Sequence, residues 1–173
     1  MTRAIIIPRS PEMRKRYKIV TIVLFVAFCS YSIAQSKAEE QLKKERSNLT
    51  RTTDPVGRTK IQIKISDLLI TLMTDAARAG EDKKAEQYLN DYSNTISDAH
   101  LTMMKTGKDA HKHPNGFKDL EISLRKQQSR LSDAGKLMDI DSREAVDKVR
   151  KQASDISDQL VKTMLLKDSN AVK

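Results

Sequence analysis

Apolar residues recur at spacings of three and four through most of the chain after residue 54, and no other feature constrains the fold as strongly. Such spacing places side chains on one face of an α-helix. Only a few residues separate the first stripe from the second, and only a few separate the third from the fourth. We therefore expect an all-α fold, an antiparallel four-helix bundle built from two helical hairpins. The stripes cover about 55–79, 82–106, 117–138 and 141–166.

The stripes also predict the hydrophobic core. One segment is ambiguous, because the alternation of Ile61, Ile63 and Ile65 is typical of a β-strand. We favour a helix there, since the stripe continues for three more turns and no partner strand is evident. The last stripe alternates three and four like a coiled-coil seam. The predicted core residues are Ile61, Ile65, Leu68, Leu72, Ala76, Ala85, Tyr88 or Leu89, Tyr92, Ile96, Ala99, Met103, Phe117, Leu120, Leu124, Leu131, Ala134, Met138, Val146, Val149, Ala153, Ile156, Leu160 and Thr163.

Capping signals mark the ends of the first hairpin. Asp54 followed by Pro55 predicts an N-cap and a first helical residue. Gly80 is predicted to end the first helix in the left-handed conformation, and Gly107 to end the second. A loop with Pro and Asn-Gly signals follows, up to Gly116.

The second hairpin is less regular. Gln127, Gln128 and Gly135 interrupt its first helix, and a glycine there costs about 1 kcal/mol relative to alanine. Asp141 and Glu144 have the spacing of a capping box at the start of the last helix. Ile140 is placed to act as its hydrophobic staple.

The N-terminal 34 residues have the three parts of a secretory signal peptide. Basic residues at 14–18 precede an apolar run over 19–29. Small residues follow at Ser32 and Ala34, so we expect cleavage between Ala34 and Gln35. This segment predicts export to the periplasm or the extracellular space.

Two alternatives to cleavage stay open. Residues 19–34 can act as an uncleaved anchor in the inner membrane, although they fall short of the ~20 apolar residues that span a bilayer. Lipid attachment at Cys29 is disfavoured, because bulky Phe28 precedes it. The start site is also open between Met1 and Met13, since Met13 would give a compact basic region.

Removing the leader weakens a nucleic-acid interpretation. The whole chain has 32 basic and 23 acidic residues, a net charge of +9. Residues 1–34 hold six of the basic residues and one acidic residue, so the mature chain keeps a net charge of +4. Only Tyr88, Tyr92 and Phe117 remain as aromatics, too few for base stacking. Without Cys29 the mature chain has no disulfide.

Residues 35–53 are strongly polar. Leu42 and Leu49 are too few to form a core face, so this segment is expected to be a solvated charged helix or a tether. The bundle domain is then predicted to cover 54–167, and a disordered tail to cover 168–173.

One cluster of residues has the composition of a metal site. His111 and His113 form a His-x-His pair, and His100 and Asp109 are candidates to complete it. The neighbouring charges of Lys108 and Lys112 oppose a cation. We therefore expect a solvated loop with no metal or other cofactor, and a metal- or anion-binding protein that uses the His111/His113 loop stays the alternative. No catalytic motif is recognisable, which favours a non-enzymatic protein.

The charged exterior permits a second kind of contact. Lys118, Arg125, Lys126 and Arg130 populate the outer part of the third helix. They suggest weak contact with an anionic membrane or envelope polymer, although a charged exterior that maintains solubility explains them as well.

Two segments resemble stretches of uncharacterised exported bacterial all-helical proteins. They are Asp54-Pro-Val-Gly-Arg-Thr-Lys-Ile-Gln-Ile-Lys-Ile-Ser-Asp-Leu-Leu-Ile70 and Asn115-Gly-Phe-Lys-Asp-Leu-Glu-Ile-Ser-Leu-Arg125. The resemblance spans residues 54–166 and implies an exported all-α protein without an assigned activity. Together with the leader it predicts an interaction or structural module of the bacterial envelope, with a protein partner that the sequence does not identify.

Overall fold

The computed structural model describes residues 37–165, and within them it contains five helices and no strand. The predicted all-α fold is therefore confirmed for this part of the chain. The leader with its cleavage site at Ala34 and Gln35, and the tail at 168–173, lie outside the described residues. The helices are 37–51, α2 (Pro55–Arg78), α3 (Asp82–Met104), α4 (Phe117–Gly135) and α5 (Ile140–Leu165).

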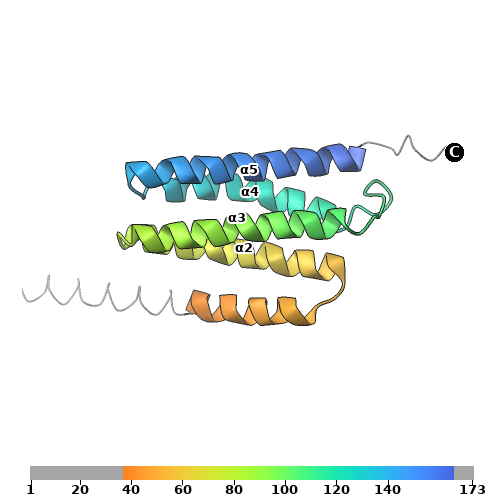
Figure 1. The fold of residues 1–173 in the computed structure, drawn as a ribbon, viewed down its shortest axis with the longest axis horizontal. Coiled ribbons are helices and arrows are strands. Elements are labelled where there is room, and N and C mark those ends of the chain that lie inside the picture. Colours follow the sequence, from red (N-terminus) through yellow and green to blue (C-terminus); the bar gives the residue numbers. More distant parts are fainter. Residues whose placement is uncertain (1–36, 166–173) are drawn as a thin grey trace, which may run out of the picture. The chain divides into compact units, whose positions relative to one another are not determined.

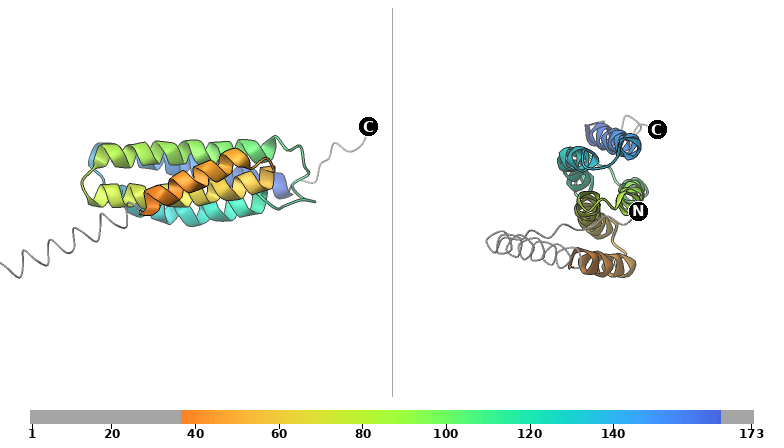
Figure 2. Two further views of the ribbon diagram at one scale, coloured as in Figure 1. Left: turned by 90° about the horizontal axis from the view of Figure 1, so that it is seen from below. Right: turned by 90° about the vertical axis from the view of Figure 1, so that its left-hand side faces the viewer.

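Helices α2 to α5 pack side by side, consistent with a helical bundle (Figures 1 and 2). The main contacts join α2 to α3 and α4 to α5. Further contacts join α2 to α4 and α3 to α5, whereas α2 and α5, as described, stay apart. In the described residues, no helix combines the length and apolarity needed to cross a bilayer.

Local capping explains where α2 begins and ends. The Asp54 carboxylate accepts a hydrogen bond from the Gly57 amide at 2.6 Å, which satisfies one of the free amides of the first turn. At the other end Gly80 has a φ of 72°, and the Glu81 amide donates to the Ala76 carbonyl at 2.9 Å. This is a Schellman motif, so both predicted ends of α2 are confirmed.

The predicted core is largely confirmed, and α2 shows the main difference. Ile61 and Leu68 are only partly buried, while Leu69, Ile70 and Met73 are fully buried. The prediction of a single stripe was therefore wrong for α2. Because α2 contacts both α3 and α4, its buried face is wider than one stripe.

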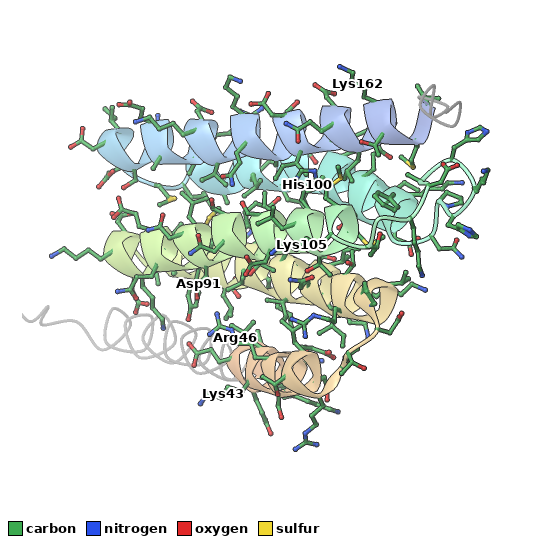
Figure 3. All side chains as sticks on the ribbon, turned by 45° about the vertical axis from the view of Figure 1, so that its right-hand side comes forward. Lys43, Arg46, Asp91, His100, Lys105 and Lys162 are labelled. Atoms are coloured by element: carbon green, nitrogen blue, oxygen red, sulfur yellow. The ribbon has the colours of Figure 1, made fainter. Side chains whose placement is uncertain are left out.

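Residues 37–51 form a helix, one of the two predicted alternatives for this segment, and this helix packs against the bundle (Figure 2). Leu42 is only 6% exposed and belongs to the core. Arg46 forms an ion pair with Asp91 on α3 at 2.7 Å, and the two side chains face each other in Figure 3. The Tyr88 hydroxyl donates to Glu39 at 3.0 Å. Leu42, with the partly buried Ala38 and Leu49, and a few polar contacts thus hold this segment on the bundle.

The predicted capping box of α5 was wrong. The helix begins at Ile140, and the Asp139 carboxylate accepts a hydrogen bond from the Ser142 amide at 2.7 Å. This contact holds the pKa of Asp139 below its ordinary value. Ile140 is 78% exposed and does not act as a staple. An aspartate two positions earlier than Asp141 makes the contact that the sequence assigned to Asp141.

Gly135 allows close packing of two helices, which its low helix propensity alone did not predict. A Cβ atom at this position would lie 3.0 Å from Cγ1 of Val146. The missing side chain therefore lets the end of α4 approach the start of α5 closely. This close approach offsets the low helix propensity of glycine.

Candidate functional site: the groove between α3 and α5

The four residues of the predicted metal cluster are divided between a helix and a loop. His100 lies on α3, whereas Asp109, His111 and His113 lie in the loop that precedes α4. Within residues 37–165, no group of three or more His, Cys, Asp or Glu side chains is arranged to hold a metal ion. The structure therefore does not assemble the four candidates into one site.

Asp109 instead organises the loop. Its Oδ1 atom accepts hydrogen bonds from the amides of His111 at 2.9 Å and Lys112 at 3.4 Å. Desolvation raises the pKa of Asp109, but these hydrogen bonds outweigh it and the pKa lies below its ordinary value. His111 Nδ1 lies 3.2 Å from the carbonyl oxygen of Met164, which ties the loop to the end of α5. His113 is exposed.

A groove of about 500 Å³ runs between α3 and α5. Leu101 and Ile156 are its apolar lining residues, and Leu101 is 50% exposed. Met104, one turn beyond Leu101, is also exposed, at 45%. Lys148 and Lys151 lie at the groove, and each forms an ion pair with an acidic residue of α5. The groove thus combines apolar side chains with polar and charged ones.

His100 is the most unusual side chain of this groove, and Figure 3 shows it between α3 and α5. Its Nε2 atom is buried, and no described residue offers that atom a hydrogen-bond partner. Burial lowers the pKa of His100 below its ordinary value, so the ring is held neutral near pH 7. A neutral imidazole nitrogen can donate to or accept from a group that enters the groove.

Hydrogen bonds join α3 to α5 at the groove residues Ser97 and Gln152. The Ser93 hydroxyl donates to Gln152 Oε1 at 2.7 Å, and Gln152 Nε2 donates to Ser97 Oγ at 2.7 Å. Ser97 in turn donates to the carbonyl oxygen of Ser93 at 3.0 Å. Its proton is therefore directed at the backbone and not at His100, so this serine is not activated as a nucleophile.

A second polar cluster lies in the core. The Tyr92 hydroxyl donates to Gln127 Oε1 at 3.0 Å, and Gln127 Nε2 lies within 3.0 Å of oxygens of Ser66, Asp67 and Ser123. Burial raises the pKa of Tyr92. We predicted that Gln127 interrupts the helix. Gln127 instead continues the apolar stripe, because it lies three residues after Leu124 and four before Leu131. Its position in the stripe could therefore have predicted that this glutamine is buried.

The predicted anionic-contact patch on α4 is partly used by the fold. Arg125 pairs with Glu121 at 2.7 Å, and Arg130 pairs with Asp67 on α2 at 2.8 Å. Lys118 and Lys126 are exposed.

Comparison with known proteins identifies no relative of this chain. The chain matches no protein-family model, and neither the curated proteins nor the solved structures include a significant match. The function is therefore argued from the groove and the surface of this chain alone.

Proposed function

We propose that this protein is an exported, non-enzymatic interaction module of the bacterial envelope, and that it binds a helical segment of a protein partner in the groove between α3 and α5. In this proposal the module is an antiparallel bundle of two helical hairpins, and the N-terminal segment directs its export.

The observation that carries the proposal is the apolar and polar lining of this groove. Leu101 lies on α3 and Ile156 on α5, and both side chains line the groove. An amphipathic helix binds such a groove through apolar residues that recur at three and four positions. His100 also lines the groove, and its imidazole adds a polar group beside these apolar side chains.

The chemistry of the groove supports binding over catalysis. A nucleophilic mechanism needs a hydroxyl that donates to a base, and the Ser97 hydroxyl donates to a carbonyl oxygen instead. Asp155, the acidic residue at the groove, is paired with Lys151 at 2.7 Å. These side chains suit recognition of a polar group beside an apolar surface.

Site-specific photo-crosslinking in the producing cell tests this proposal. A photoreactive amino acid at Gln159, an exposed groove residue, should give one adduct of defined mass. The same amino acid at Ser129, on the exposed surface of α4, is the matched control and should not give that adduct. Leu101→Glu should abolish the adduct at Gln159 without unfolding the protein, because Leu101 is half exposed.

Equal adducts from Gln159 and Ser129 would contradict the proposal, because they would show contact without a preferred face. An adduct at Gln159 that persists in the Leu101→Glu protein would also contradict it, since the apolar wall would then be dispensable.

A further inference from the structure

One end of the bundle brings together segments that are distant in sequence. This loop end consists of residues 51–60, 104–119 and 160–165. His111 Nδ1 lies 3.2 Å from the Met164 carbonyl oxygen, which joins the loop to the end of α5. Lys60 on α2 lies 3.9 Å from the Asp119 carboxylate on α4. The charges of these segments therefore act on the same part of the surface.

The loop end is strongly basic. Its eight basic residues outnumber its three acidic residues, which gives a net charge of +5. The segments at the opposite end, 75–86 and 133–144, carry eight acidic and five basic residues, a net charge of −3. The charged residues of the loop end are Arg51, Arg58, Lys60, Lys105, Lys108, Lys112, Lys118 and Lys162, with Asp54, Asp109 and Asp119.

The acidic residues of the loop end are occupied by internal contacts. Asp54 caps α2, Asp109 accepts the loop amides, and Asp119 faces Lys60. In contrast, Lys105 and Lys162 are exposed, and neither forms an ion pair with another described residue. Both are visible on the surface in Figure 3. The lysines are therefore available to an external anion.

Exposed apolar side chains accompany these lysines. Met104 is 45% exposed at the end of α3, and Leu165 is 75% exposed at the end of α5. Surfaces that lie on a membrane combine basic residues, which attract anionic headgroups, with apolar residues that enter the headgroup boundary. A soluble polyanion would use the charges and leave the apolar residues in water.

We infer that the loop end docks onto an anionic phospholipid surface, with its lysines at the headgroups and Met104 and Leu165 at the acyl boundary. The acidic opposite end is repelled by the same surface, so the bundle binds loop end first. This surface is separate from the helix-binding role of the groove and does not depend on it. Screening by salt acts within about 10 Å at 0.1 M, so docking weakens as salt rises.

Vesicle flotation tests this inference with the protein in the form that accumulates in the producing cell. Partitioning is measured on vesicles of phosphatidylcholine alone and of phosphatidylcholine with 30% phosphatidylglycerol, a composition of about one anionic lipid in three. The ratio of the two values reports binding that depends on lipid charge. It cancels any apolar contribution that is the same on both vesicles.

Two triple variants with equal net charge separate a docking surface from general basicity. Lys105→Gln/Lys108→Gln/Lys162→Gln should reduce the ratio about 100-fold, because each lysine near the surface contributes about fivefold. Lys64→Gln/Lys83→Gln/Lys126→Gln removes three exposed lysines elsewhere and should reduce it less than about fivefold.

Equal losses in the two variants would overturn the inference, because binding would then follow net charge alone. A wild-type ratio near one would overturn it as well. A third result would also overturn it. If the protein bound soluble polyphosphate as well as it binds anionic vesicles, and Met104→Ser/Leu165→Ser left vesicle binding unchanged, the apolar residues would play no part.

Discussion

The Tyr92 hydroxyl donates a hydrogen bond to Gln127 Oε1 across 3.0 Å in the interior of the bundle. The tyrosine side chain is fully buried and the glutamine is 1% exposed, so water does not replace either partner easily. The contact joins α3 to α4, two helices that otherwise touch little. It therefore fixes the relative position of helices from the two halves of the bundle.

Replacing this tyrosine tests the importance of the contact. Tyr92→Phe should lower the free energy of unfolding by about 1–3 kcal/mol, because Gln127 Oε1 would stay buried without a donor. Chemical denaturation with an unchanged m-value measures the loss. Tyr88→Phe is the control, and it should cost about 1 kcal/mol or less, since its partner Glu39 is partly exposed. Equal losses in the two variants would contradict this account.

The close approach of Gly135 to Val146 gives a second prediction. Gly135→Ala should destabilise the protein by about 1 kcal/mol, because overpacking costs about 1–3 kcal/mol and helix propensity returns about 1 kcal/mol. In a Val146→Ala background the same change should stabilise by about 1 kcal/mol. A double-mutant cycle in denaturant should thus show a coupling near 2 kcal/mol. A coupling below about 0.5 kcal/mol would mean that the two helix ends do not meet at this distance.

The burial of His100 predicts a dependence of stability on pH. Burial lowers its pKa below the ordinary value of 6.5, so the unfolded chain binds the proton more readily than the folded protein. The stabilising contribution is therefore complete above pH 6.5 and is lost as the pH falls below it. Unfolding free energies between pH 7.5 and 5.5 should show this loss, and His100→Gln should reduce it. Asn94→Gln, an exposed change on α3, serves as control. Parallel curves for wild type and His100→Gln would refute the assignment.

The leader gives a prediction about the mature N-terminus. N-terminal sequencing of protein from the producing cell should find Gln35 first, because Ser32 and Ala34 have the small side chains that a signal peptidase accepts. Ala34→Phe should block cleavage, whereas Ile33→Leu should not. Intact wild-type chain in the membrane fraction would instead support an anchor formed by residues 19–34.

Sequence periodicity predicted the helices well because each stripe reports one buried face. On α3 the predicted residues from Ala85 to Met103 are all buried, with Leu89 chosen over Tyr88. It performed less well on α2, where contact with two neighbouring helices buries Leu69 and Ile70 as well. Periodicity describes each helix separately and does not identify its neighbours.

The candidate site was harder to predict for the same reason. His100 was selected for its ability to bind metal, whereas its position opposite Gln152 and Ile156 depends on how α3 and α5 pack. Polar residues such as Gln127 were misjudged because a buried side chain needs a partner on another helix. Such a pairing across 35 residues of sequence leaves no local pattern.

The attachment of the helix at 37–51 determines how the protein responds to mechanical load. A force applied at residue 37 acts first on the Glu39–Tyr88 hydrogen bond and on the Arg46–Asp91 ion pair. These exposed or half-buried contacts are weaker than the packed interior between α2 and α3. Under tension this helix should peel away as a separate step and extend the chain while the remaining helices stay folded. Tension on its N-terminal side would thus lengthen the first helix of the domain before it disturbs the bundle.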